Sequence, residues 1–99
     1  MLEIILLSLA VIVFEAIVTF VVLAMAEILD WFLKFEQELD ETTLPFTIRN
    51  QLENGEYTVY QGLFDATRNE VRKARKIGAK RLDDRLRELH SRDELAIYE

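Results

Sequence analysis

The sequence predicts an all-α protein, with one long N-terminal transmembrane helix followed by a small helical hairpin domain. Three observations predict this fold class. The chain opens with an apolar run from Ile4 to Ala26, its only proline is Pro45, and the apolar residues of its second half recur at helical spacing. We therefore divide the 99 residues into a membrane helix with its extension, residues 1–41, and a helical extramembrane domain, residues 42–99.

The apolar run decides the first half of this prediction. Glu15, at its centre, is the only ionisable residue between Ile4 and Ala26. A helix between these two residues spans about 34 Å, enough to cross a hydrocarbon core of roughly 30 Å. Its Leu, Ile, Val and Phe residues contribute on the order of −7 kcal/mol to insertion, against roughly 3 kcal/mol for a central acid. The apolar residues outweigh Glu15, so we expect the helix to insert.

Two other interpretations of this run compete with a membrane helix. A soluble helical oligomer could bury residues 4–26, although a chain of 99 residues offers little material to wrap a helix that is apolar nearly all round. A signal peptide is suggested by the small residues of Ala24-Met25-Ala26. That interpretation lacks a basic segment before the run, and the run is long and is interrupted by Glu15.

The predicted helix continues past the membrane to about Asp40. Trp31 suits the aromatic belt at the membrane interface, and Lys34 can extend its ammonium group to the lipid headgroups. Equally, Trp31 could pack on the helices that follow. Every Lys and Arg lies after the apolar run, which favours a cytoplasmic C-terminus for this single-pass protein.

A polar stripe follows one face of the predicted membrane helix. Ser8 and Thr19 are about three helical turns apart, a spacing that returns a helix to nearly the same face, and Glu15 lies one turn before Thr19. Such a stripe should face protein or a water-filled cavity, because acids inside membranes rarely face lipid. Glu15 is then either a protonated hydrogen-bonding group between helices or the proton carrier or cation ligand of a channel.

The second half of the chain is predicted to form further helices. Pro45 ends the first helix and opens a short one to Glu53, with Thr43 as its N-cap. Asn54-Gly55 then supplies a helix stop or a tight turn. From Tyr57 to about Leu89 the apolar residues share one helical stripe, and the sequence Ser91-Arg92-Asp93-Glu94 has the form of a capping box.

The charges of the second half are separated along the chain. Residues 36–65 hold seven acids and one base, whereas residues 68–81 hold seven bases and one acid, so the two segments could attract each other within or between chains. The basic segment could instead bind anionic lipid or remain a solvated helix face. It lacks interleaved aromatic residues, so nucleic acid is not expected as a partner. Its basic residues are Arg68, Arg72, Lys73, Arg75, Lys76, Lys80 and Arg81.

The sequence offers little catalytic chemistry. It contains no cysteine, and its single histidine, His90, has no glutamate three or four residues before it, the spacing of a di-metal site. Its three isolated glycines do not form a phosphate-binding loop. We therefore expect no enzyme, no cofactor and no metal.

Together these observations predict a non-enzymatic single-pass membrane subunit. It would assemble with itself or with a larger membrane complex through the polar stripe and the helical tail, so the expected partners are the lipid bilayer and other copies or subunits. The first alternative is a small homo-oligomeric ion or proton channel centred on Glu15. The second is the soluble helical oligomer described above.

Overall fold

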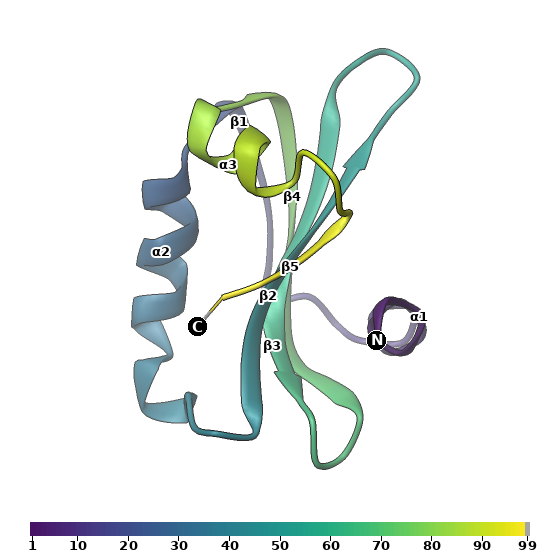
Figure 1. Ribbon diagram of the computed structural model, residues 1–99, viewed down its shortest axis with the longest axis vertical. Coiled ribbons are helices and arrows are strands. Elements are labelled where there is room, and N and C mark those ends of the chain that lie inside the picture. Colours follow the sequence, from purple (N-terminus) through teal and green to yellow (C-terminus); the bar gives the residue numbers. More distant parts are fainter. Residues whose placement is uncertain (99) are drawn as a thin grey trace.

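A computed structural model of the chain describes residues 1–98. It contains one five-stranded sheet with the strand order β1-β4-β3-β2-β5, flanked by short helices (Figure 1). Along the chain the elements are α1 Leu2–Leu9, β1 Ala16–Leu23, α2 Met25–Lys34, the 3₁₀ turn η1 Glu36–Glu38, β2 Thr43–Gln51, β3 Tyr57–Asp65, β4 Glu70–Leu82, α3 Asp84–Leu89 and β5 Leu95–Ile97.

The apolar run does not form one helix, and its residue types explain why. Its first part, LEIILLSL, is rich in leucine, a strong helix former, and becomes α1. The segment AIVTFVVL is dominated by β-branched residues and phenylalanine, which favour strands, and becomes β1. The run then ends in the amphipathic helix α2, whose buried residues Met25, Ile28, Trp31 and Phe32 lie on one face.

This division overturns the predicted fold class. Within residues 1–98 no helix has the length and apolar character needed to span a membrane. The prediction of an all-α, single-pass membrane protein with a cytoplasmic C-terminus is therefore wrong. The predicted membrane subunit is wrong with it, and so is the channel centred on Glu15, which required the same helix. The helical oligomer is also wrong in its fold, because residues 4–26 include a strand.

The sheet is mixed. β2, β3 and β4 form an antiparallel meander, and the short β5 pairs antiparallel with β2. β1 pairs parallel with β4, with Ile17 opposite Lys76 and Thr19 opposite Gly78. The first strand of the chain therefore forms one edge of the sheet, and the last strand forms the other.

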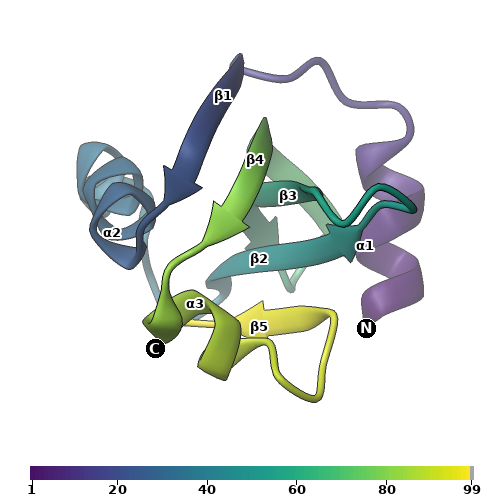
Figure 2. The ribbon, with the colours of Figure 1, turned by 90° about the horizontal axis from the view of Figure 1, so that it is seen from above.

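Helices cover both faces of this sheet, giving three layers (Figures 1 and 2). On one face α2 and α3 bury the first core, whose members are Leu23, Met25, Ile28, Trp31, Phe32, Val59, Leu63, Ile77, Ala79, Leu82 and Leu86. On the other face α1 buries a smaller core of Ile5, Leu9, Phe46, Ile48, Phe64, Val71 and Ala74. Because α1 is short, it covers only part of its face.

The predicted helices of residues 45–53 and 57–89 are strands instead, except for the short α3. Pro45 lies within β2, where its carbonyl accepts a hydrogen bond from the amide of Tyr98. Its missing N–H points to that same side, away from β3, so no hydrogen bond between β2 and β3 is lost. Thr43 begins β2 and caps no helix.

Two turns build the hairpins of the meander. Gly55 joins β2 to β3 with a φ of 87°, a conformation that suits glycine, so Asn54-Gly55 is a tight turn. Between β3 and β4 the carboxylate of Asp65 accepts from the amides of Thr67 and Arg68, and Asn69 is left-handed with φ 55°. Phe64 and Val71, two apolar residues of the helix predicted over residues 57–89, are in fact opposed across this hairpin.

Candidate functional site: an open sheet edge and a basic cleft

The outer edge of β1 carries backbone groups that no further strand pairs with inside residues 1–98. The amide of Glu15 donates to the carbonyl of Ala74, and the carbonyl of Leu23 accepts from the amide of Asp83. Since backbone groups alternate sides along a strand, the odd-numbered residues of β1 bond to β4 and the even-numbered ones face outward. The outward-facing residues are Ala16, Val18, Phe20 and Val22.

The side chains of β1 alternate between the two faces of the sheet. Val18 and Phe20 pack against the core beneath α2. Thr19 lies beside Gly78, on the face that α1 partly covers. On that face Ile17 is 73% exposed and Val21 is 61% exposed. β1 therefore combines free backbone groups with exposed apolar side chains.

Sequence features that normally protect an edge strand are missing from β1. Natural proteins shorten such strands, bulge them, or place charge or proline on them to prevent pairing with other chains. β1 has eight residues, none of them charged, and contains neither proline nor glycine. Its composition also fits the pattern of a segment with high β-propensity and low charge, which pairs readily when exposed.

Exposed apolar residues concentrate in the same part of the chain. More than half of the large apolar side chains that are exposed lie between Met1 and Val22, a stretch that makes up less than a quarter of the sequence. Val11 and Val13, in the connection from α1 to β1, are 85% and 89% exposed. Exposed apolar side chains that adjoin one another mark an interaction surface more often than scattered ones do. We call β1 and these exposed residues the β1 surface.

The structure does not bring the predicted polar stripe together on one helix. Ser8 lies in α1, and its hydroxyl accepts a hydrogen bond from the amide of Val71. Glu15 is exposed in the connection before β1, and Thr19 is exposed within β1. Ser8 thus joins α1 to the sheet, while Thr19 belongs to the β1 surface and Glu15 immediately precedes β1.

The two residues predicted for a membrane interface both lie in the second half of α2, but only one of them is buried. Trp31 is buried in the first core, where its ring meets Phe35 with 4.8 Å between centroids. The sequence also allowed the alternative that Trp31 packs on the helices that follow. Trp31 does pack on other elements of the chain, but most of these elements are strands. Lys34 is exposed in the last turn of α2, where a cation is favourable.

The basic segment forms the turn before β4 and most of β4 itself, so its charges alternate across the sheet. Arg68 pairs with Glu70 at the turn, and both Arg72 and Lys73 pair with Glu38, at 3.7 and 3.2 Å. The acidic and basic segments therefore do meet within one chain, at Glu38. Lys76 is half-buried, and Lys80 and Arg81 are exposed at the end of β4.

Arg75 differs from the other bases because it is buried. Its Nε donates to Oε1 of Gln61 at 2.8 Å, and its guanidinium lies over the Trp31 ring and reaches the Glu27 carbonyl. The side-chain Nε2 of Gln61 in turn donates to the Ile28 carbonyl. Burial lowers the pKa of Arg75, opposed by the nearby Glu27 carboxylate. This pair fixes α2 to the sheet, so Arg75 has a structural role.

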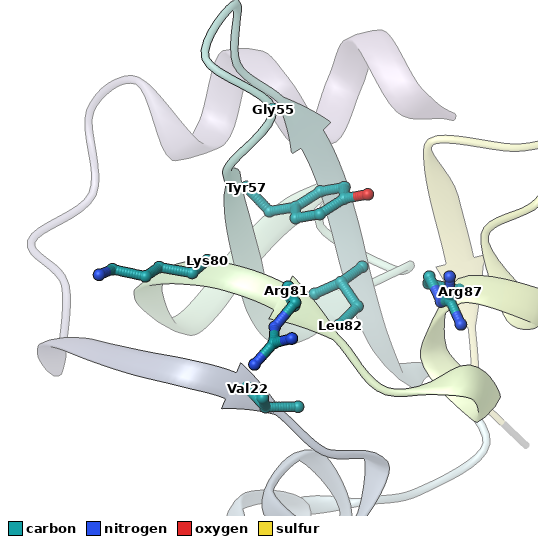
Figure 3. A pocket seen from close by; sticks show the side chains of 7 residues that line it. All are labelled: Val22, Gly55, Tyr57, Lys80, Arg81, Leu82 and Arg87. Atoms are coloured by element: carbon teal, nitrogen blue, oxygen red, sulfur yellow. The ribbon is translucent and has the colours of Figure 1, made fainter.

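A basic cleft lies where β1 and β4 end, next to the β2–β3 turn (Figure 3). Its volume is about 500 Å³. The cations around it are Lys80, Arg81 and Arg87, and Arg87 is paired with Asp84. Lys80 and Arg81 form no ion pair with any described residue. The remaining lining residues are Val22, Gly55, Tyr57 and Leu82.

His90 is buried at the opposite edge of the sheet. Its Nδ1 lies 3.0 Å from the Asp93 carbonyl, which can only accept, so Nδ1 carries the proton and Nε2 accepts from the Thr47 hydroxyl at 2.8 Å. The Tyr98 hydroxyl then donates to Thr47 Oγ1. Burial lowers the pKa of His90, and burial raises that of Tyr98. His90 is thus a neutral structural group.

Several of these features were missed from the sequence. The free edge of β1 has a local signal, the β-branched residues of AIVTFVVL, but the hydropathy of the longer run concealed it. The cleft joins residues from β1, β3, β4 and α3, and the His90 cluster joins β2 to the C-terminal segment. No spacing within the sequence could have identified either grouping. Among residues 1–98 no group of three or more acidic or histidine side chains is arranged to hold a metal.

Comparison with known proteins gives no family to which the chain can be assigned. No protein-family model, curated protein or solved structure matches it.

Proposed function

We propose that this chain is a non-enzymatic assembly domain whose β1 edge receives a β-strand from another polypeptide. The observation that carries the proposal is the uncharged, eight-residue β1 strand at the end of the sheet. Strand addition uses main-chain hydrogen bonds for affinity and alternate side chains for specificity. β1 offers both, through its four outward-facing residues and through exposed Ile17 and Val21.

The test uses a substitution that changes only the outward side of β1. Val22→Pro removes an outward N–H and leaves the ladder with β4 intact, because the Val22 amide does not face β4. We expect the wild-type protein, isolated under non-denaturing conditions, to have a molar mass above the 11.6 kDa of one chain. The variant should lose that extra mass. Light scattering after size-exclusion chromatography measures both.

The matched control is Leu33→Lys, which places a charge on a residue of α2 that is exposed to the same extent as Val21. It should leave the assembly unchanged. A wild-type mass of one chain under every condition, or an assembly that Val22→Pro leaves intact, would contradict the proposal.

A second candidate function is the binding of an anionic small molecule in the basic cleft. It is favoured by the two cations, Lys80 and Arg81, that no described carboxylate neutralises. Clefts of about 300–1,000 Å³ are typical of ligand sites. Tripolyphosphate, titrated by calorimetry, is a suitable probe. The double variant Lys80→Gln/Arg81→Gln should abolish its binding, whereas Lys76→Gln, outside the cleft, should not.

A further inference from the structure

We infer that the strand received at β1 is β1 of a second copy, paired antiparallel about a two-fold axis at Thr19. This inference rests on the proposed function and names the partner and the register. In this arrangement residue 16 faces residue 22 of the second copy, residue 18 faces residue 20, and Thr19 faces itself. The axis runs perpendicular to the two sheets, which join into one of ten strands.

The register follows from which backbone groups are free. An antiparallel ladder forms when outward-facing residues of one strand lie opposite outward-facing residues of the other, each pair exchanging two hydrogen bonds. Pairing about Thr19 places all four outward-facing residues of β1 opposite outward-facing residues of the second copy. It therefore satisfies the whole edge, with about eight hydrogen bonds. A shift by two residues in either direction leaves at least one of these residues unpaired.

Side chains support the same register. On the face that α1 partly covers, Ile17 of one copy lies opposite Val21 of the other, and the two Thr19 side chains meet at the centre. Thr–Thr pairs stabilise antiparallel strands, and the Ile–Val pair removes apolar surface from water. The pairing covers the two most exposed apolar side chains of β1, Ile17 and Val21.

Charge complementarity favours a second copy as the occupant. No charged residue lies within β1, so the pairing opposes no like charges along the strand. Glu15, which immediately precedes β1, comes opposite Leu23 of the second copy. That end of β1 adjoins the end of β4, where Arg81 pairs with Val22 and Lys80 precedes it. Glu15 is thus separated from the end of the second copy's β4, which carries Lys80 and Arg81, by one strand, while the two Glu15 residues stay about 26 Å apart.

The area of a single strand pair sets the expected affinity. Two strands of this length bury less than the roughly 800 Å² per partner of a standard interface. The exposed Val11 and Val13, which lie in the connection before β1, add apolar area beside it. We therefore expect a dissociation constant on the order of micromolar, so the experiment samples chain concentrations from about 1 to 500 μM.

The experiment uses cysteine cross-linking, for which the chain provides a clean background because it has no cysteine. In a pair of residues that face each other without exchanging hydrogen bonds, the Cα atoms lie about 4.5 Å apart, within disulfide range. Thr19→Cys should therefore form a covalent dimer rapidly on mild oxidation. Ile17→Cys should not cross-link to itself, because its counterpart lies about 13 Å away along the strand.

Mixing two variants tests the register directly. Ile17→Cys mixed with Val21→Cys should form a mixed disulfide, since these positions face each other. Leu33→Cys, exposed on α2 to the same extent as Val21, reports the rate of collisional cross-linking. We expect Thr19→Cys to cross-link at least tenfold faster than Leu33→Cys, and the rate to fall to the Leu33→Cys level when Val22→Pro is added.

The failures of the two proposals are distinguishable. If Thr19→Cys and Ile17→Cys both cross-link to themselves, the strands are parallel and in register, and the inference is overturned. If neither does, but Val22→Pro still dissociates an assembly, β1 receives a different strand or register, and only the inference fails. If the wild-type chain is a monomer over the whole concentration range and carries no other bound polypeptide, the proposed function fails as well.

Discussion

The two edges of the sheet are built in opposite ways. β5, at one edge, has three residues and is held by a buried polar cluster in which Tyr98, Thr47 and His90 are joined by hydrogen bonds. β1, at the other edge, has eight residues, no charge and exposed apolar side chains. Short strands protect an edge from pairing, whereas long apolar ones invite it. The difference indicates that the β5 edge is protected from pairing with another strand, whereas the β1 edge is available to a partner.

The largest effect should come from placing proline on the inner side of β1. Val21→Pro removes an N–H that faces β4, leaves a β4 carbonyl without a partner and forces the ring into the ladder. We expect it to lower the free energy of unfolding by about 3 kcal/mol. Val22→Pro should lower it by less than about 1 kcal/mol, because its N–H faces outward. Urea unfolding of both, at a concentration where each is monomeric, measures the contrast; equal losses would mean the two sides of β1 are not distinct.

Removing one hydroxyl group from the β5 edge should lower the stability of the protein. Thr47→Val keeps the shape of the side chain but leaves the buried His90 ring and the Tyr98 hydroxyl without their shared partner. Leaving buried polar groups unsatisfied costs about 1–3 kcal/mol, and we expect a loss of about 2 kcal/mol in the free energy of unfolding. Thr47→Ser retains the hydroxyl and serves as the control. If both variants were equally stable, the cluster would contribute nothing to this edge.

The stability that the His90 cluster gives to the β5 edge should depend on pH. Burial lowers the pKa of His90 below its ordinary 6.5, and the Arg49 charge acts in the same direction, opposed by hydrogen bonds to the Asp93 and Glu94 backbone and by the Asp93 carboxylate. The unfolded chain therefore binds this proton more readily than the folded one. The free energy of unfolding should fall as pH drops below about 6.5, and level off below the lower pKa of the folded state.

The contribution of His90 to this pH dependence is isolated by a variant that cannot titrate. His90→Gln should be less stable at pH 7.5, yet the difference between it and the wild-type protein should shrink as the pH is lowered to 5. Denaturant unfolding at several pH values gives this difference. A difference that stayed constant with pH would show that His90 does not respond to the proton.

The smallest effect on stability should come from the basic cleft, which lies beside the open edge. Lys80 and Arg81 are exposed and form no ion pair with described residues. Replacing either with glutamine should change the free energy of unfolding by less than about 0.5 kcal/mol. Thermal unfolding of each variant checks this. A larger loss would assign these residues to the fold and would argue against a ligand role.

The sequence predicted some local features of this molecule but not its fold class. The tight turn at Asn54-Gly55 and the helical character of Leu-rich residues 2–9 could be predicted from the chain. The hydropathy of residues 4–26 is the same whether they form one membrane helix or a short helix followed by a connection and a strand. Hydropathy sums apolar area and ignores β-branching, so it could not distinguish the two. AIVTFVVL held the missing information.

The remaining errors arose because the partners are distant in sequence. β1 pairs with β4, so that Ala16 lies opposite Arg75, and this pairing alone makes β1 an edge strand. Charged β4 resembles a solvated helix until its neighbours are known, since Arg75 is buried only because Gln61 and an α2 carbonyl accept its hydrogen bonds. The candidate sites therefore depend on topology and not on local pattern.

Amide hydrogen exchange along β1 tests the central claim most directly. At a low chain concentration the amides of Ile17 and Thr19, which bond to β4, should be protected, while those of Val18 and Phe20 should exchange freely. At about 500 μM, once β1 pairs with a second copy, the amides of Val18 and Phe20 should become protected as well, and Val22→Pro should weaken this protection. Amides of Val18 and Phe20 that exchange freely at every concentration would contradict the account.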